Sequence, residues 1–225
     1  RCVILSHQSV LDRVKAANEG LQLSAIDRVI WVLPMAYHFV VSIILYIRDG
    51  CGIIVCDDFL AENILDKAAE YEGTFLYASP MHIRLLASSK KQVHLPSLRS
   101  VISTTTGISP LTCKTFEEKY RLPVSQAFGI IEAGLPIINL RQSSEHPEAV
   151  GFGLPSFTIA ILDHSFKPVP PGETGQLAIK GPGMFDGYLS PPTRREEVLK
   201  EGWFITGDLS SMTIDGLVEI KGRTK

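Results

Sequence analysis

Between residues 29 and 127 the chain alternates short apolar runs with amphipathic segments, and this alternation limits its possible folds more than any other feature. The apolar runs are continuous, which is typical of strands buried on both faces of a parallel sheet. We therefore expect an α/β fold, with a mostly parallel sheet flanked by helices. The expected strands are 29–33, 52–56, 75–77, 99–103 and 124–127, and the expected helices are 39–47, 60–71, 80–86 and 110–120.

A parallel sheet of this kind also predicts where a ligand binds. Right-handed crossovers place the strand-to-helix loops at one edge of the sheet, and open α/β sheets bind ligands at that edge. The loops expected there are 34–38, 57–58, 78–79, 104–107 and 128–134.

The two ends of the chain differ from this series. Before it, Ser6 or Ser9 can cap a helix that reaches Gly20. After about Leu135, short strands separated by turns rich in Pro and Gly predict a small antiparallel β subdomain that is barrel-like. We expect one subdomain at 1–134 and the second at 135–225. The residues expected on the inward face of the first helix are Val10, Leu11, Val14 and Ala17, and the later strands expected are 135–139, 158–162, 176–180 and 217–220.

Composition excludes several classes of protein. The formal net charge is -2 with both signs interspersed, so no nucleic-acid partner is expected. The four cysteines form no CxxC pair, which favours a reduced, cytoplasmic protein without zinc. The apolar stretch Val29–Ile47 approaches the length of a membrane span. Because Pro34 interrupts it and His38 and Ser42 are costly in lipid, we expect no membrane span.

Two stretches combine residue types that suit a nucleotide. Asp208 follows a Thr-Gly turn and Arg223 follows Gly222; a carboxylate accepts from a vicinal diol, and a guanidinium binds phosphate or ribose oxygens. An ordinary β-hairpin with surface charges explains these two residues equally. In 126–134, the ring of Phe128 can stack on a base, and Gly129 would let the backbone approach a ligand closely. The carboxylate of Glu132 suits magnesium. A glycine turn before a helix-start glutamate is the alternative there.

Several blocks together resemble the adenylate-forming superfamily of acyl-CoA synthetases, peptide-synthetase adenylation domains and luciferases. The segment 202–209, Gly-Trp-Phe-Ile-Thr-Gly-Asp-Leu, is followed at similar spacing by Asp215-Gly216 and by Gly-Arg-Thr-Lys at 222–225. The segment 126–134 resembles the superfamily's Tyr-Gly-x-Thr-Glu block, and 104–111 resembles the segment that lines the adenine pocket. The segment 33–38 resembles the block beside the carboxylate substrate.

The resemblance implies a two-step reaction. A carboxylate and ATP give an acyl-adenylate and pyrophosphate, and the thiol of coenzyme A or of an acyl carrier protein's phosphopantetheine then takes the acyl group. The substrate is expected to be a small-molecule carboxylic acid, and the apolar residues Phe39, Val40, Val41, Ile130 and Ile131 favour an apolar one, although the same residues can serve as core. Acyl-CoA ligase, fatty acyl-adenylate ligase and adenylation domain remain open, with the first favoured. The residues implied for ATP or AMP are Thr106, Gly107, Ile108, Ser109, Ala127, Phe128, Gly129, Ile131, Asp208 and Arg223; those for the substrate are Tyr37, His38, Gly129 and Ile130; those for catalysis are Glu132, Arg223 and Lys225, with Glu132 also holding Mg2+.

The chain departs from the superfamily pattern at two positions. Phe128 replaces a tyrosine, and Ile131 replaces a threonine whose hydroxyl contacts a phosphate; losing such a donor costs roughly tenfold to a thousandfold in rate. A non-catalytic relative that binds a nucleotide or acyl group is therefore the alternative. The phosphate loop expected before Arg1 and the mobile domain expected after the hinge at Lys225 are absent, so we expect a fragment that is nearly inactive alone.

Overall fold

The computed structural model describes residues 2–224, apart from the side chain of Tyr37. Contacts divide the chain into two compact units, which we describe separately. The central unit comprises Gln22–Ala127 and Asn139–Glu148, and the terminal unit comprises the remaining described residues. The subdomain boundary expected after Gly134 stays a prediction.

The central unit is built on parallel strands, as the apolar runs predict. Strand order is β3-β2-β4-β5-β6, and each neighbouring pair is parallel. The inner strands β2, β4 and β5 bury nearly every side chain, whereas the edge strand β3 buries only Ile54; burial on both faces explains the continuous apolar sequence of the inner strands. The bounds are β2 (Arg28–Trp31), β3 (Gly52–Val55), β4 (Phe75–Ala78), β5 (Ser100–Ser103) and β6 (Val124–Ile130), the last of which continues into the terminal unit.

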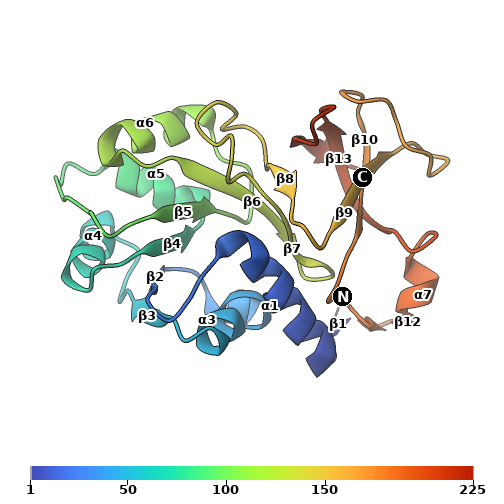
Figure 1. Ribbon diagram of the computed structural model, residues 1–225, viewed down its shortest axis with the longest axis horizontal. Helices are drawn as coiled ribbons and strands as arrows, with labels where there is room; N and C mark the ends of the chain where they lie inside the picture. The colour runs from blue at the N-terminus through green and yellow to red at the C-terminus, as the bar shows by residue number, and fades with distance from the viewer. Residues whose placement is uncertain (1, 225) are drawn as a thin grey trace. The chain divides into compact units, whose positions relative to one another are not determined.

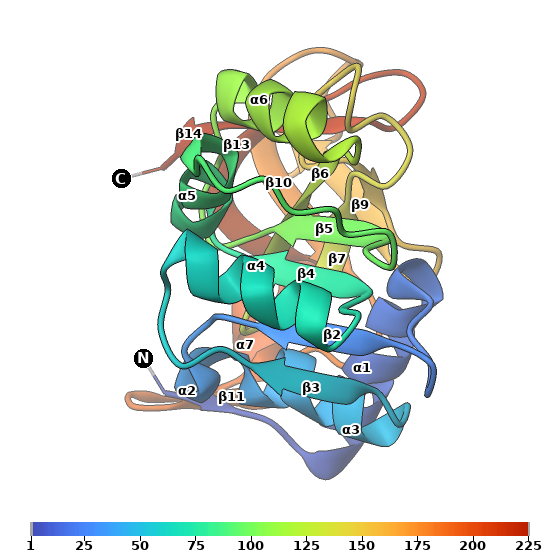
Figure 2. The same ribbon diagram turned by 90° about the vertical axis from the view of Figure 1, so that its left-hand side faces the viewer.

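Helices α4 (Ala61–Glu70), α5 (Pro80–Ser88) and α6 (Pro110–Tyr120) lie side by side along the sheet (Figure 2). Ile64 and Leu65 of α4 and Ile83 of α5 are buried on the faces that turn inward. The three helices expected at 60–71, 80–86 and 110–120 are thus confirmed. Apolar residues three and four apart in the sequence share one helix face.

The segment expected to be one buried helix at 39–47 is instead divided into three. It consists of α2 (Met35–His38), the π-helix η1 (Phe39–Ile43) and α3 (Ile44–Arg48). It is also less buried than expected, because Phe39 is 46% exposed and Ile47 is 65% exposed. Its last part, α3, contacts the edge strand β3, and Leu45 and Tyr46 are each only 1% exposed. No helix in the described residues is both long enough and apolar enough to cross a membrane.

The terminal unit begins with β1 (Val3–Ile4) and α1 (His7–Leu21) and contains two antiparallel sheets (Figure 1). One sheet has the order β14-β13-β10-β9 and the other has the order β1-β11-β12. The antiparallel part of the fold is therefore confirmed. The bounds are β9 (Thr158–Leu162), β10 (Gly175–Lys180), β11 (Gly187–Leu189), β12 (Pro192–Arg194), α7 (Arg195–Val198), β13 (Phe204–Met212) and β14 (Val218–Arg223).

The strand expected at 135–139 does not belong to either antiparallel sheet. It is β7 (Gly134–Ile138), which follows β6 after a three-residue turn and continues the large sheet in the order β6-β7-β8. Strand β8 (Phe152–Gly153) pairs antiparallel with β7. The change of texture near Leu135 is thus a change from parallel to antiparallel pairing within one sheet.

The inward face of α1 differs from the sequence expectation at two positions. Val14 and Ala17 are buried as expected, but Leu11 is 49% exposed and Arg13 is only 1% exposed. Hydrogen bonds from Arg13 to backbone carbonyls explain its burial and are described below.

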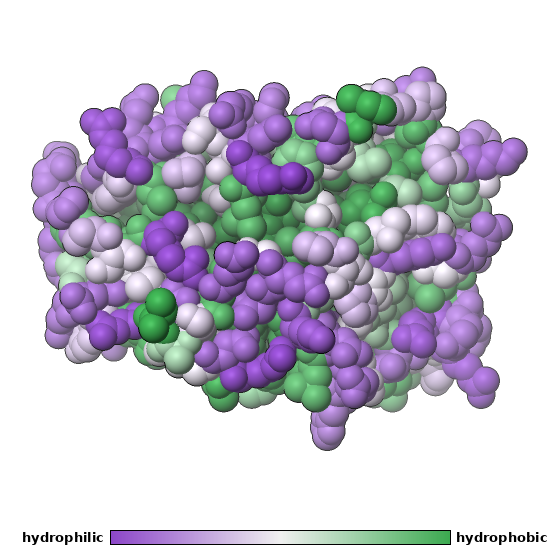
Figure 3. All heavy atoms as spheres, in the orientation of Figure 1, coloured by the Kyte–Doolittle hydropathy of each residue, from purple (hydrophilic) through white to green (hydrophobic). Residues whose placement is uncertain are grey.

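Elsewhere, hydrophilic side chains cover most of the surface visible in Figure 3, as the interspersed charges predict.

Candidate functional site

The loop after β5 carries one group of the residues expected to contact a nucleotide. Thr106, Gly107 and Ser109 are exposed, whereas Ile108 is buried. Thr105 has a φ of 82°, a left-handed conformation that costs a threonine free energy. The exposed hydroxyls and the glycine therefore stand at the carboxyl end of a parallel strand, where ligands bind in such sheets.

A residue that we did not single out from the sequence fixes this loop. Gln126 is 4% exposed, and its Oε1 accepts a hydrogen bond from the Ile108 N–H at 3.3 Å. Its Nε2 donates to the carbonyl of Pro147 at 2.5 Å. Gln126 thus joins the loop to β6, directly before Ala127, which is buried. The only sequence signal was a polar residue within an apolar strand.

Ser109 does not cap α6 with its side chain, although serine is a common residue at that position. It occupies the residue before Pro110 with an extended ψ of 132°, and it makes no capping hydrogen bond. Its hydroxyl is exposed. The proline supplies the fixed φ that starts the helix, so the helix begins there without a serine cap.

His38 lies in a group of aromatic side chains in the central unit. Its ring meets Trp31 edge-on at 5.8 Å and Tyr77 edge-on at 6.0 Å between centroids. Burial lowers the pKa of His38, because the charged imidazolium loses its hydration. His38 is therefore a neutral, half-buried ring at neutral pH. The expected alternative, the side chain of Tyr37, lies outside the described residues.

The hairpin between β6 and β7 carries a second group. Residues 131–133 form the turn, so Glu132 belongs to a hairpin and does not begin a helix. Phe128 and Ile130 are half-buried, Gly129 is exposed, and Ile131 is 40% exposed. At Gly129 a Cβ atom would lie 3.1 Å from the carbonyl of Gly134, so the glycine permits the two strands to approach closely.

Glu132 is half-buried and is held at two points. Its side-chain Oε1 accepts a hydrogen bond from the Tyr188 hydroxyl at 2.9 Å, and its backbone carbonyl accepts from the Phe185 N–H at 2.8 Å. Neither Tyr188 nor Phe185 belongs to a motif that we recognised in the sequence. Their aromatic rings pack in one buried cluster with Met184 and Phe204.

Asp208 and Arg223 are paired across the β13–β14 ladder. Their Cα atoms are register partners, and Oδ1 of Asp208 lies 3.8 Å from Nε of Arg223. The Asp208 side chain is 14% exposed and the Arg223 side chain is 74% exposed. The Asp208 N–H donates to Thr206 Oγ1 at 3.0 Å, and Gly207 has a φ of 80°, which a glycine adopts readily.

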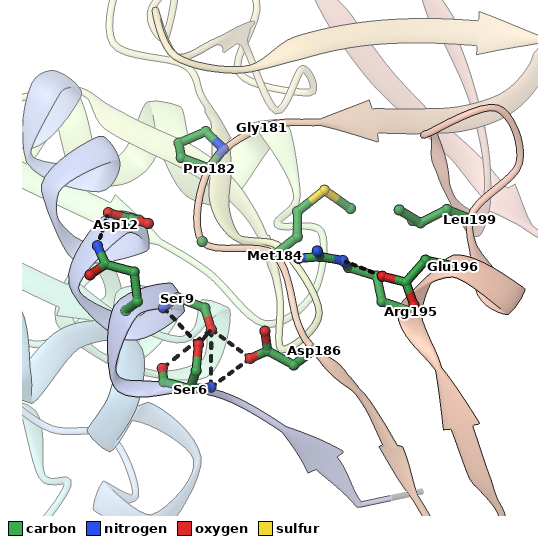
Figure 4. Close-up of a pocket in the computed structure, with 12 residues that line it drawn as sticks. Ser6, Ser9, Asp12, Gly181, Pro182, Met184, Asp186, Arg195, Glu196 and Leu199 are labelled. Atoms are coloured by element: carbon green, nitrogen blue, oxygen red, sulfur yellow. Dashed lines mark hydrogen bonds and ion pairs between the residues drawn. The ribbon is translucent and has the colours of Figure 1, made fainter.

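A cavity of about 480 Å³ lies elsewhere in the terminal unit, between the start of α1 and residues 181–186 (Figure 4). On its wall, Asp186 accepts hydrogen bonds from the Ser6 N–H at 2.6 Å and the Ser9 hydroxyl at 2.7 Å. Burial alone would raise the pKa of Asp186, but these hydrogen bonds outweigh it and hold the pKa below 3.8. Among the described residues, no member of the predicted nucleotide set lines this cavity.

The donor set around Glu132 can be tested against magnesium. No cluster of three or more His, Cys, Asp or Glu residues that could hold a metal occurs in residues 2–224. Magnesium needs no such cluster, because it keeps waters and takes one or two carboxylates together with substrate phosphates. A single half-buried carboxylate such as Glu132 fits this mode of binding.

Comparison with known proteins identifies the family. The model of the family described as AMP-binding enzyme matches residues 1–189. The chain belongs to this family. Among the curated relatives of this chain, the sulfoacetate–CoA ligase of Cupriavidus necator is 28% identical to it, over 99% of this chain and 45% of the length of the ligase. The long-chain-fatty-acid–CoA ligase of Salmonella typhimurium is 26% identical over 99% of this chain and 41% of its own length.

Solved structures agree with this assignment. ATP-bound MatB from Rhodopseudomonas palustris aligns with a TM-score of 0.89 and 26% identity, covering 98% of this chain and 45% of that one. The chain therefore spans less than half the length of the AMP-binding enzymes compared with it. The fold agrees over 98% of this chain, and the family model covers residues 1–189.

Proposed function

We propose that the chain forms part of an AMP-forming carboxylic acid ligase. Such an enzyme joins a carboxylate to the α-phosphate of ATP, releases pyrophosphate, and transfers the acyl group from the adenylate to a thiol with release of AMP. The observation that carries the proposal is the pairing of Asp208 with Arg223, which sets a carboxylate beside a guanidinium at one strand end. A ribose diol and an adjacent phosphate need this pair of groups.

The remaining residues have proposed roles in the same reaction. In the central unit, the 104–109 loop supports the adenine, and Ala127, within β6, contacts the nucleotide. In the terminal unit, Phe128 and Gly129 face the nucleotide or the acyl group. Glu132 holds magnesium, which when bound would offset the phosphate charge that develops during adenylation. Lys225, expected to assist at the hinge, lies outside the described residues.

The substrate is proposed to be a small-molecule carboxylic acid with an apolar acyl group. The half-buried His38 is neutral and sits against aromatic rings, which suits an apolar acyl group better than a second anionic group. Ile130, the last residue of β6, is the second residue proposed to contact the acyl group. Coenzyme A is the proposed thiol and an acyl carrier protein the alternative one. We place the protein in the cytoplasm, where both are reduced.

The experiment that tests the proposal is calorimetric titration of the purified protein with AMP and with ATP plus Mg2+. Binding of both, and loss of AMP binding in Asp208→Ala, is the expected result. Pyrophosphate exchange with a panel of carboxylic acids is expected to be nearly absent for this chain alone. A protein that binds neither nucleotide would refute the proposal, and exchange at the rate of an intact ligase would refute the expected inactivity.

The alternative is a non-catalytic relative that binds a nucleotide or an acyl group. Ile131 favours it, because a 40% exposed isoleucine stands in the hairpin where a hydroxyl is expected. The variant Ile131→Thr discriminates between the two. A large gain in binding of ATP with Mg2+ would favour the non-catalytic relative. Little change would mean that a hydroxyl at position 131 is dispensable.

A further inference from the structure

Arg13 of α1 joins two segments that are far apart in the sequence. Its Nη1 donates to the carbonyl of Ile131 at 2.9 Å, and its Nε and Nη2 donate to the carbonyl of Gly183 at 2.9 Å and 2.6 Å. Ile131 directly precedes Glu132, so the guanidinium is one residue away from the proposed metal ligand. The planar fork of an arginine can bridge two carbonyls in this way, which a lysine ammonium cannot reproduce.

The loop that Arg13 binds also holds Glu132. Phe185, two residues after Gly183, donates its N–H to the Glu132 carbonyl at 2.8 Å. Tyr188, which is 6% exposed, donates its hydroxyl to Oε1 of Glu132 at 2.9 Å. Among the described residues, Oε2 of Glu132 accepts no hydrogen bond. The carboxylate is therefore fixed through one oxygen, and the other remains for a ligand.

The surroundings of Arg13 are built to admit it despite the cost of burying a charge. Burial lowers the pKa of Arg13 to about 10, while the negative charges of Asp186 and Glu132 oppose that change. Two glycines with positive φ make room: Gly134 at 80° and Gly183 at 66°. A Cβ atom on Gly183 would lie 2.4 Å from the backbone nitrogen of Arg13.

We propose that Arg13 and Tyr188 are positioning residues for Glu132, which hold its carboxylate in the orientation that binds a metal–triphosphate. This inference rests on the proposed function. Arg13 fixes the backbone of the turn, and Tyr188 fixes the side chain. Both act through Glu132, so their loss affects the part of nucleotide binding that depends on the metal and spares the part that does not.

The test measures two affinities of the purified protein by calorimetry: ATP with Mn2+, and AMP with EDTA. In Tyr188→Phe, which removes one hydroxyl, we expect the Mn2+-dependent gain to fall about fivefold, as for loss of one hydrogen bond. In Arg13→Lys we expect a fall of at least that size. AMP affinity in EDTA should change less than about twofold in both. Tyr120→Phe, which removes a hydroxyl bonded to the Leu86 carbonyl in the central unit, is the matched control.

Glu132→Gln separates the two levels of inference. If it abolishes the Mn2+-dependent gain while Tyr188→Phe and Arg13→Lys keep it, the positioning role is overturned and the metal role of Glu132 stands. If Glu132→Gln keeps the gain, the metal role fails and the positioning role fails with it. A wild-type protein that binds no ATP overturns the proposed function itself. Circular dichroism checks folding, and the isosteric Tyr188→Phe provides the test if Arg13→Lys does not fold.

Discussion

Asp27 and Arg99 form a two-point ion pair at the amino ends of β2 and β5. The Asp27 oxygens accept from Arg99 Nε at 2.8 Å and from Nη2 at 3.0 Å, and the Thr74 hydroxyl donates to Oδ1 at 2.8 Å. Burial alone would raise the pKa of Asp27, but these hydrogen bonds hold it below 3.8. The pair lies at the edge of the sheet opposite the 104–109 loop, so its expected role is stability.

Removing Arg99 is therefore expected to destabilise the protein without changing nucleotide affinity. Asp27 is 2% exposed, so Arg99→Met leaves a buried carboxylate without its cation and costs about 3 kcal/mol of unfolding free energy. Urea unfolding measures it. The double variant Asp27→Asn/Arg99→Met is the control, and it should recover part of the loss. Equal destabilisation in both would show that the unpaired charge is not the cause.

Gly183 and Gly172 give a matched pair of glycine variants. Both have positive φ, 66° and 85°, but only at Gly183 does a Cβ atom meet the backbone of α1, at 2.4 Å. We expect Gly172→Ala to cost about 1 kcal/mol from the backbone conformation alone. Gly183→Ala should cost at least about 2 kcal/mol more, because the loop must move away from Arg13. Thermal and urea unfolding compare them, and equal losses would contradict the close contact.

His82 is expected to make stability depend on pH below neutrality. It is 4% exposed, and burial lowers its pKa, so the folded protein keeps it neutral when the unfolded chain takes up a proton. The neutral His82 contributes its full stabilisation of the folded protein above pH 6.5, the ordinary pKa of histidine. As the pH falls from there toward the lower pKa of the folded state, the free energy of unfolding decreases by up to about 1.4 kcal/mol per pH unit.

The measurement compares the unfolding free energy of wild type and His82→Gln between pH 7.5 and pH 5. The variant loses the contact between Nδ1 and the Ser79 hydroxyl at every pH, so only the slope is informative. His38, whose pKa burial also lowers, is present in both proteins and cancels. Identical slopes would mean that His82 takes up its proton equally in the folded and unfolded states.

Asp208→Asn should weaken AMP binding with little effect on stability. The variant loses a charge-assisted acceptor for the ribose diol, worth about tenfold in affinity. Its partner Arg223 is 74% exposed, so the pair itself contributes less than about 0.5 kcal/mol to folding. Calorimetry and urea unfolding measure the two effects. Glu219→Gln, on the same strand as Arg223, is the control and should change neither.

Much of the central unit could be predicted because its signals are local. Helices α4, α5 and α6 and strands β2 to β6 follow from apolar periodicity, and their parallel order follows from the crossovers. Segment 35–48 could not be predicted in this way, because its continuous apolar run does not indicate the π-helix at Phe39–Ile43 that divides it. The hairpin at Glu132 could not either, since a glycine near a glutamate suits a turn and a helix start equally.

The sequence by itself determined the family and the types of side chain available for a nucleotide: Asp208, Arg223, Glu132 and the 104–109 loop. Only the tertiary structure decided which partners hold them, such as Gln126 for Ile108 and Arg13 and Tyr188 for the turn at Glu132. The reason is physical: these hydrogen bonds join residues 18, 56 and 118 positions apart, and such pairings leave no periodicity in the chain. Each exists only once both segments are packed together.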